Sequence, residues 1–139
     1  MNDRLKSLLT PFAAPAVESE DSAEDIAVAV NRSRDVVLAR RVLWAGTSAL
    51  RRRGLLGRDS IDADEGVYLV PCQWIHMFGM RFPIDVAFLD STGRVLAIHH
   101  GLRPNRFSRP VLRAEGVLEL ASGRLNDTGT RVGDIIELQ

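Results

Sequence analysis

The stretch IDVAFLDSTGRVLAIHH, residues 84–100, holds two apolar runs on either side of a polar turn. The runs, 84–89 and 94–100, are rich in the aliphatic, β-branched and aromatic residues that favour strands. The Asp-Ser-Thr-Gly sequence between them, residues 90–93, is typical of a tight turn, because aspartate bonds its own backbone and glycine readily adopts a positive φ. The stretch therefore predicts a β-hairpin.

Other β-rich runs lie on both sides of this hairpin and are separated by turn residues. Their residue ranges are 26–30, 36–44, 66–70, 73–78, 116–120 and 134–138. About seven strands without repeated helical crossovers predict a mainly β protein, a single small antiparallel sandwich or barrel.

Two short helices are expected between the strands. The first covers residues 49–53, with Thr47 or Ser48 as its N-cap and a glycine directly after it. The second has Ser122 as its N-cap and ends near Gly129. Neither is long enough to change the prediction of a β-rich fold.

The composition is that of an ordinary globular chain. Its 139 residues leave room for one domain and a tail. The shares of hydrophobic residues, 45%, and charged residues, 26%, exclude collagen-like, mucin-like and wholly disordered chains. No apolar run approaches the ~20 residues that cross a bilayer. The single cysteine, Cys72, excludes an intramolecular disulfide.

Residues 1–25 are acidic, rich in alanine and proline, and poor in the large apolar residues that drive folding. We therefore expect a flexible tail, followed by a β-rich domain at 26–139. Within the tail, residues 4–12 carry leucines and a phenylalanine at helical spacing, so they can form a short amphipathic helix. That helix could dock on a partner, on a membrane or on the domain itself. No core of a secretory signal is evident, and a lone thiol suits a reducing compartment, so the expected location is the cytoplasm.

Asp85 is the most informative single residue. Alternate residues of the 84–89 strand point to opposite faces, and apart from Asp85 both sets are apolar, which places the strand inside the fold. A buried carboxylate needs hydrogen-bond donors, and the candidates are Arg81 and the backbone amides of the Phe82–Pro83 corner. Asp85 either locks the bend before the hairpin or orients a ligand at the mouth of a barrel pocket.

Cys72 and His76 suggest a nucleophile or a zinc site, but an extended chain separates them by about 13 Å. Zinc ligands must all lie within about 2.3 Å of the metal, so we expect neither role. We expect a buried histidine bonded to the backbone and a cysteine that fills apolar space. His99 and His100 are adjacent, so on a strand they point to opposite faces and cannot chelate together. No metal and no cofactor are predicted.

Arginines gather in two places. The Arg51–Arg53 triplet would spread over about 200° of a helix, which predicts a solvated basic helix rather than a nucleic-acid patch. Arg103, Arg106 and Arg109 recur at every third residue, and in a polyproline II segment they would share one face at intervals of roughly 9 Å. This basic loop at 103–113 could bind an acidic partner, a polyanion or the acidic tail. The alternative is a mobile loop with solvated side chains.

From Leu38 onward the chain resembles the bacterial and archaeal family called domain of unknown function 192. The motifs that carry the resemblance are Thr47-x6-Gly54-Leu55-Leu56-Gly57-Arg58, HMFGMRFPIDVAFLD at 76–90 followed by Gly93-Arg94-Val95, GVLEL at 116–120, Gly123, and Gly129-x3-Gly133-Asp134. This chain has the His-x-Phe-Gly-Met-Arg version of the central motif. The resemblance implies a single, mostly β domain and no established activity.

Together these features favour an uncharacterised, non-catalytic binding or accessory domain. Its polar site would involve His76, Arg81 and Asp85, and the basic loop at 103–113 would contact a partner. The expected partner is an unknown protein or a small anionic ligand. One alternative is a small hydrolase or transferase that uses Asp85 or His76 as general base, with Arg81. Another is a polyanion or nucleic-acid binder through the arginine-rich loops, which overall neutrality makes the less favoured class.

Overall fold

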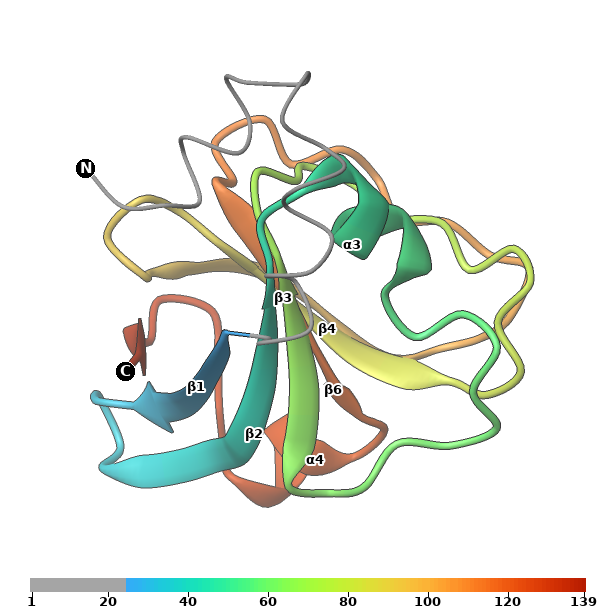
Figure 1. Cartoon of the computed structure of the whole chain (residues 1–139). Coiled ribbons are helices and arrows are strands. Elements are labelled where there is room, and N and C mark those ends of the chain that lie inside the picture. The colour runs from blue at the N-terminus through green and yellow to red at the C-terminus, as the bar shows by residue number, and fades with distance from the viewer. Residues whose placement is uncertain (1–24) are drawn as a thin grey trace.

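The computed structural model of the chain describes residues 25–139, and Figure 1 shows a curled β-sheet with two short helices. The elements are β1 (Ile26–Asn31), β2 (Val36–Ala45), α3 (Ser48–Arg53), β3 (Glu65–Leu69), β4 (Ile84–Leu89), β5 (Val95–Leu102), β6 (Gly116–Ala121), α4 (Arg124–Asp127) and β7 (Ile136–Leu138). The predicted helix at 4–12 and all of the tail except Asp25 lie outside the described residues.

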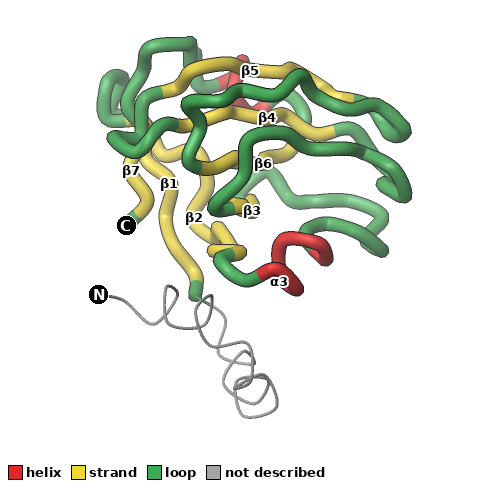
Figure 2. Tube along the Cα trace, turned by 90° about the horizontal axis from the view of Figure 1, so that it is seen from above, coloured by secondary structure: helices red, strands yellow, loops and turns green. Residues whose placement is uncertain are grey.

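The strands form a single seven-stranded sheet in the order β5-β4-β6-β3-β2-β1-β7. Figure 2 shows from above how this sheet curls into a half-barrel, so the predicted mainly β fold is confirmed. Neighbouring strands are antiparallel except β2 and β3, which run parallel. This pair differs from the antiparallel expectation because the connection 46–64, which contains α3, is long enough for a crossover.

The two edges of the sheet meet at one end, where the turn between β4 and β5 contacts the start of β7. The Val95 N–H donates to the Asp134 carbonyl at 2.8 Å, and the Ile136 N–H donates to the Gly93 carbonyl at 2.8 Å. Gly93 has a φ of +87°, and a Cβ at this position would clash with the carbonyl oxygen of Ile136. A glycine is therefore required where the sheet closes.

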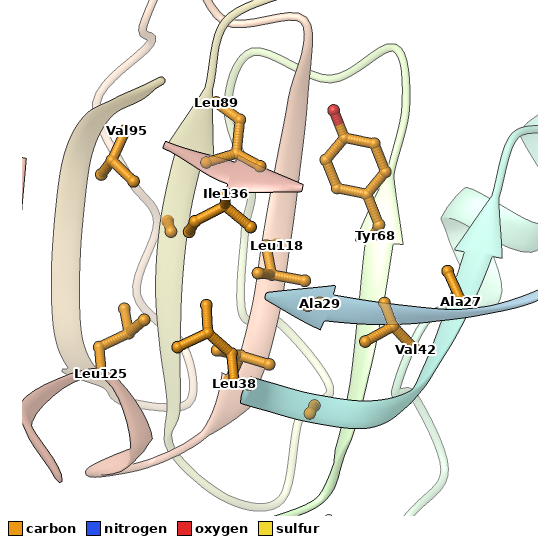
Figure 3. Close-up of a cluster of buried hydrophobic side chains, with 13 residues drawn as sticks. Ala27, Ala29, Leu38, Val42, Tyr68, Leu89, Val95, Leu118, Leu125 and Ile136 are labelled. Atoms are coloured by element: carbon orange, nitrogen blue, oxygen red, sulfur yellow. The ribbon is translucent and has the colours of Figure 1, made fainter. Parts of the chain in front are cut away.

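Hydrophobic cores lie on both faces of the sheet. Figure 3 shows the core that the curl encloses, in which Leu38 and Leu118 pack with Leu125 of α4. The other core lies on the outer face, between the strands and the connecting segments, and includes Met77 and Phe88. Every residue of β4 is buried, as predicted for this strand, because both cores cover it.

The first helix begins as the sequence predicts. Thr47 caps α3, since its Oγ1 accepts the Leu50 N–H at 3.1 Å, and the helix ends at Gly54, which has a φ of +39°. The second cap differs from the prediction, because Gly123 rather than Ser122 is the N-cap of α4 and no side chain caps it. No helix within residues 25–139 has the length and hydropathy needed to cross a bilayer.

The predicted strand at 73–78 is wrong. These residues form an extended segment with an isolated bridge between His76 and Phe107, and they join no strand of the sheet. Their backbone partner is the loop after β5, whose Ser108 N–H donates to the Ile75 carbonyl at 2.9 Å. The segment and this loop together cover the outer core.

Candidate functional site

Asp85 is fully buried on the inner face of β4. Its Oδ1 accepts the Gly101 N–H at 2.8 Å, and its Oδ2 accepts the Leu125 N–H at 2.9 Å. The side chain therefore ties β5 and the first turn of α4 to β4. One buried side chain thus satisfies two backbone N–H groups from distant parts of the chain, so Asp85 is an anchor of the fold.

The donors predicted for Asp85 are wrong. Arg81 is exposed and donates instead to Asp59, at 2.9 Å. Within residues 25–139, Asp85 accepts hydrogen bonds from Gly101 and Leu125 and not from the corner before the strand. Arg81 does not reach Asp85 because the Asp85 side chain points into the core enclosed by the curl, while Arg81 lies on the surface.

His76 is exposed, so the expectation of a buried histidine is wrong. In the extended segment the buried side chains are its neighbours Ile75 and Met77, and alternation turns His76 outward. Its ring stacks on Phe78 with centroids 5.3 Å apart. The polar site predicted between His76 and Asp85 is therefore divided, with the histidine on the surface and the aspartate in the inner core.

A cavity of about 690 Å³ opens beside His76, between α3, the segment 71–80 and the outer face of the sheet. This volume lies within the ~300–1,000 Å³ typical of small-molecule sites. Much of the wall is apolar and includes Leu55, Ile75 and Met80. The polar and charged side chains at the cavity are Arg51, Arg53, Cys72, His76 and Glu119.

Glu119 contributes a carboxyl to the wall of this cavity. It lies in β6, in register with Val67 of β3 and Val86 of β4, and is only 6% exposed. Burial raises the pKa of its carboxyl to about 7, and no hydrogen bond or ion pair from the described residues offsets this effect. A buried carboxyl without a compensating bond is costly, so it is a site where a ligand's hydrogen-bond donor would be favourable.

Cys72 and Arg51 shape the wall of the cavity. The Cys72 thiol donates to the Trp74 carbonyl at 3.1 Å, and burial raises its pKa, so it is a protonated thiol rather than a nucleophile. The Arg51 guanidinium donates to the carbonyls of Gly46 and Val70, at 3.2 and 3.1 Å. Arg51 therefore holds α3 against the segment after β3, where the sequence suggested a solvated side chain.

The other histidines lie away from the cavity. His99 packs edge-on against the Phe88 ring, with centroids 6.1 Å apart, and His100 is exposed. Alternation along β5 therefore turns them to opposite faces. Across residues 25–139, no three His, Cys, Asp or Glu side chains are grouped in a way that could hold a metal ion.

Arg103, Arg106 and Arg109 are exposed on the connection between β5 and β6. None of them forms an ion pair with the part of the chain that the structure describes. The backbone of this connection is bonded to the segment 73–78, since the Arg106 carbonyl accepts the Met77 N–H at 2.7 Å. The loop thus displays positive charge beside that segment.

Glu119 is the candidate that the sequence analysis missed. The argument that singled out Asp85 also applies to it, since Glu119 is the acidic residue within the apolar run 116–120. The sequence does not show that the turn after α3 leaves a cavity over this carboxyl. That space depends on segments distant in sequence, so no local pattern reveals it.

Comparison with known proteins identifies a family without an assigned activity. Residues 28–138 match the model of the family DUF192, described as "Uncharacterized ACR". A UPF0127 protein from Thermococcus sibiricus (strain DSM 12597 / MM 739) is 32% identical over 113 residues, which cover 78% of this chain and 72% of that protein.

Two solved structures share the fold. A protein of unknown function from Novosphingobium aromaticivorans DSM 12444 has a TM-score of 0.70 and 25% identity, covering 82% of this chain and 84% of its own. A protein from Sinorhizobium meliloti 1021, named a "putative transcription regulator", has a TM-score of 0.71 and 25% identity, covering 83% of this chain and 95% of its own.

Proposed function

The chain belongs to the uncharacterised DUF192 family, and we propose that its domain is a non-catalytic binding module that takes a small molecule in the cavity beside Glu119. The observation that carries this proposal is the buried carboxyl of Glu119, which has no compensating bond from the described residues and lines a cavity of ligand size. A fitting ligand has an apolar body and a hydrogen-bond donor.

Charge narrows the ligand class further. With a pKa of about 7, Glu119 is partly ionised near neutral pH and accepts from an ammonium, amide or hydroxyl group. Arg51 and Arg53 also line the cavity, and their positive charge suits an anionic group at the other end of the ligand. The proposed ligand therefore still includes the anionic group that the sequence led us to expect. A cytoplasmic location is part of the same proposal, because the lone Cys72 suits a reducing compartment.

The arrangement of the polar groups supports binding over catalysis. The hydrolase or transferase alternative needs Asp85, His76 and Arg81 to converge on one point. In the structure Asp85 lies in the inner core and Arg81 is paired with Asp59, so these groups do not converge.

An enzyme at the cavity would instead use Glu119 as its general base, since its pKa lies near neutrality. Hydrolysis of p-nitrophenyl acetate that is lost in Glu119→Gln would favour an enzyme.

Methyl NMR of the full chain with benzylamine, benzyl alcohol and benzoate tests the proposal. We expect benzylamine to shift the methyl signals of Leu55, Ile75 and Met80 and to bind more tightly at pH 8 than at pH 6, because Glu119 ionises between these values. Glu119→Gln should weaken benzylamine roughly tenfold, since a hydrogen bond to a charged group is lost.

Glu115→Gln is the matched control, because Glu115 is exposed and lies outside the cavity lining. This control should leave benzylamine binding unchanged. Shifts that map elsewhere, or equal affinity in the wild type and Glu119→Gln, would contradict the proposal. Preference for benzoate in both proteins would show that the arginines, not Glu119, set the ligand class.

A further inference from the structure

A row of exposed aromatic rings begins at the cavity, whose lining includes Trp74 and His76, and continues over the surface. Trp74, His76 and Phe78 alternate along the extended segment and so point the same way, while Phe107 lies opposite His76 across their bridge. Successive ring centroids, from Trp74 through His76 and Phe78 to Phe107, are 6.1, 5.3 and 6.5 Å apart. We call these four residues the aromatic row.

This surface exposes far more apolar area than a scattered surface side chain does. Trp74, Phe78 and Phe107 are 51%, 52% and 66% exposed, and Leu112 is 78% exposed. The backbone of Leu112 is tied to the start of the same segment, since its carbonyl accepts the Gln73 side-chain amide at 2.6 Å. Contiguous exposed apolar side chains of this kind mark an interaction surface.

The aromatic row is bordered by positive charge. Arg106 directly precedes Phe107 in the loop, and Arg109 follows Phe107 by two residues. The loop 103–113 contains no acid, and its four arginines are all exposed: Arg103, Arg106, Arg109 and Arg113. Within the described chain none of these four forms an ion pair. The surface is therefore complementary in charge to an anionic partner.

We propose that the aromatic row and the four arginines of the 103–113 loop bind the surface of a membrane rich in anionic lipids. Aromatic side chains such as Trp74 favour the headgroup level of a bilayer, where an amphipathic ring contacts both phases. Leu112 adds aliphatic area for the acyl boundary, and the arginines contact the lipid phosphates. This inference does not depend on the cavity beside Glu119 holding a ligand.

The packing of the rings favours lipid over single-stranded nucleic acid, which also has negative charge. Bases bind by stacking on open ring faces. His76 and Phe78 stack on each other with an interplanar angle of 28°, so they cover part of those faces. Leu112, the most exposed large apolar side chain described, offers nothing for a base to stack on.

Co-sedimentation of the full chain with vesicles tests the proposal. We expect binding to vesicles of equal parts phosphatidylcholine and phosphatidylglycerol, little binding to phosphatidylcholine alone, and weaker binding as salt is raised. The triple variant Arg103→Gln, Arg106→Gln, Arg109→Gln should lower the partition coefficient on the order of 100-fold, at about fivefold for each arginine.

Tryptophan fluorescence locates the contact. In a Trp44→Phe background Trp74 is the sole tryptophan, and its emission should shift to the blue and be quenched by brominated lipid on binding. A control variant, Arg40→Gln with Arg41→Gln, removes two exposed charges from β2 and should leave vesicle binding unchanged.

Three results would overturn the proposal. The first is equal vesicle binding by the wild type and the triple arginine variant, with both shown by NMR to be folded. The second is Trp74 emission that does not change when the protein sediments with vesicles. The third is tighter binding to oligo-dT than to the mixed vesicles with the same loss in the triple variant, which would assign this surface to nucleic acid.

Discussion

Asp85 and Glu119 lie on neighbouring strands but on opposite faces of the sheet, since Asp85 is in register with Leu120 and Glu119 with Val86. Two backbone N–H groups donate to Asp85. Glu119 has no such bond from the described residues, and burial raises its pKa. The same sequence pattern, one acidic residue within an apolar strand, thus has two outcomes. Asp85 stabilises the fold, whereas Glu119 lowers the stability of the fold and makes the cavity wall polar.

Replacing Asp85 by asparagine tests the structural role. Asparagine offers one acceptor oxygen where aspartate offers two, so the Gly101 or the Leu125 N–H is left without its partner. We expect the free energy of unfolding to fall by about 2–4 kcal/mol in urea titrations. Asp59→Asn, at an exposed ion pair with Arg81, is the control and should change it by less than about 1 kcal/mol. Equal effects would contradict the anchor.

Glu119→Gln tests the cost of burying this carboxyl. Its folded pKa of about 7 exceeds the ordinary value of 4.5, so its contribution is fully favourable below pH 4.5 and is lost as pH rises through 7. The difference between the two pKa values corresponds to a change of about 3 kcal/mol in the free energy of unfolding. Relative to Glu119→Gln, the wild type should therefore lose about this much between pH 4.5 and 8 in denaturant titrations. A difference that is constant with pH would refute this assignment.

Among the elements, the turn between β4 and β5 both forms the hairpin and closes the sheet against β7. Gly93→Ala and Gly57→Ala separate backbone strain from the clash at the closure. The φ values are similar, +87° and +83°, but a Cβ at Gly93 would clash with Ile136, whereas one at Gly57 meets nothing within 4 Å. The change at Gly57 should cost about 1–2 kcal/mol of backbone strain. Gly93→Ala should cost at least twice that and speed hydrogen exchange at Val95 and Ile136. Equal losses would mean that the closure contributes nothing.

Local patterns predicted most of the elements but not their partners. The hairpin and the buried strand β4 follow from alternation and turn chemistry within a few residues. The donors to Asp85 lie 16 and 40 residues away in the sequence, so the residues next to Asp85 do not predict them. The segment 73–78 does alternate between buried and exposed residues, as a strand would, but it pairs with a loop outside the sheet.

For the whole molecule, one sheet supports both cores, and β4 contributes to each of them. We therefore expect a single unfolding transition, as is usual for a domain of this size. Leu125→Ala in the inner core and Met77→Ala in the outer core should each cost about 2–5 kcal/mol, since both side chains are fully buried. Val132→Ala, at 60% exposure, is the control. Separate midpoints in near- and far-ultraviolet circular dichroism would show independent cores.

The role of the cavity depends on the state of one carboxyl, which carbon-13 NMR can follow directly. A pH titration of the Glu119 side chain should give a pKa of about 7 in the protein alone, and a lower value with saturating benzylamine, because the ammonium group stabilises the carboxylate. A pKa near 4.5 without any ligand, or one that benzylamine does not change, would contradict a ligand-binding role for Glu119.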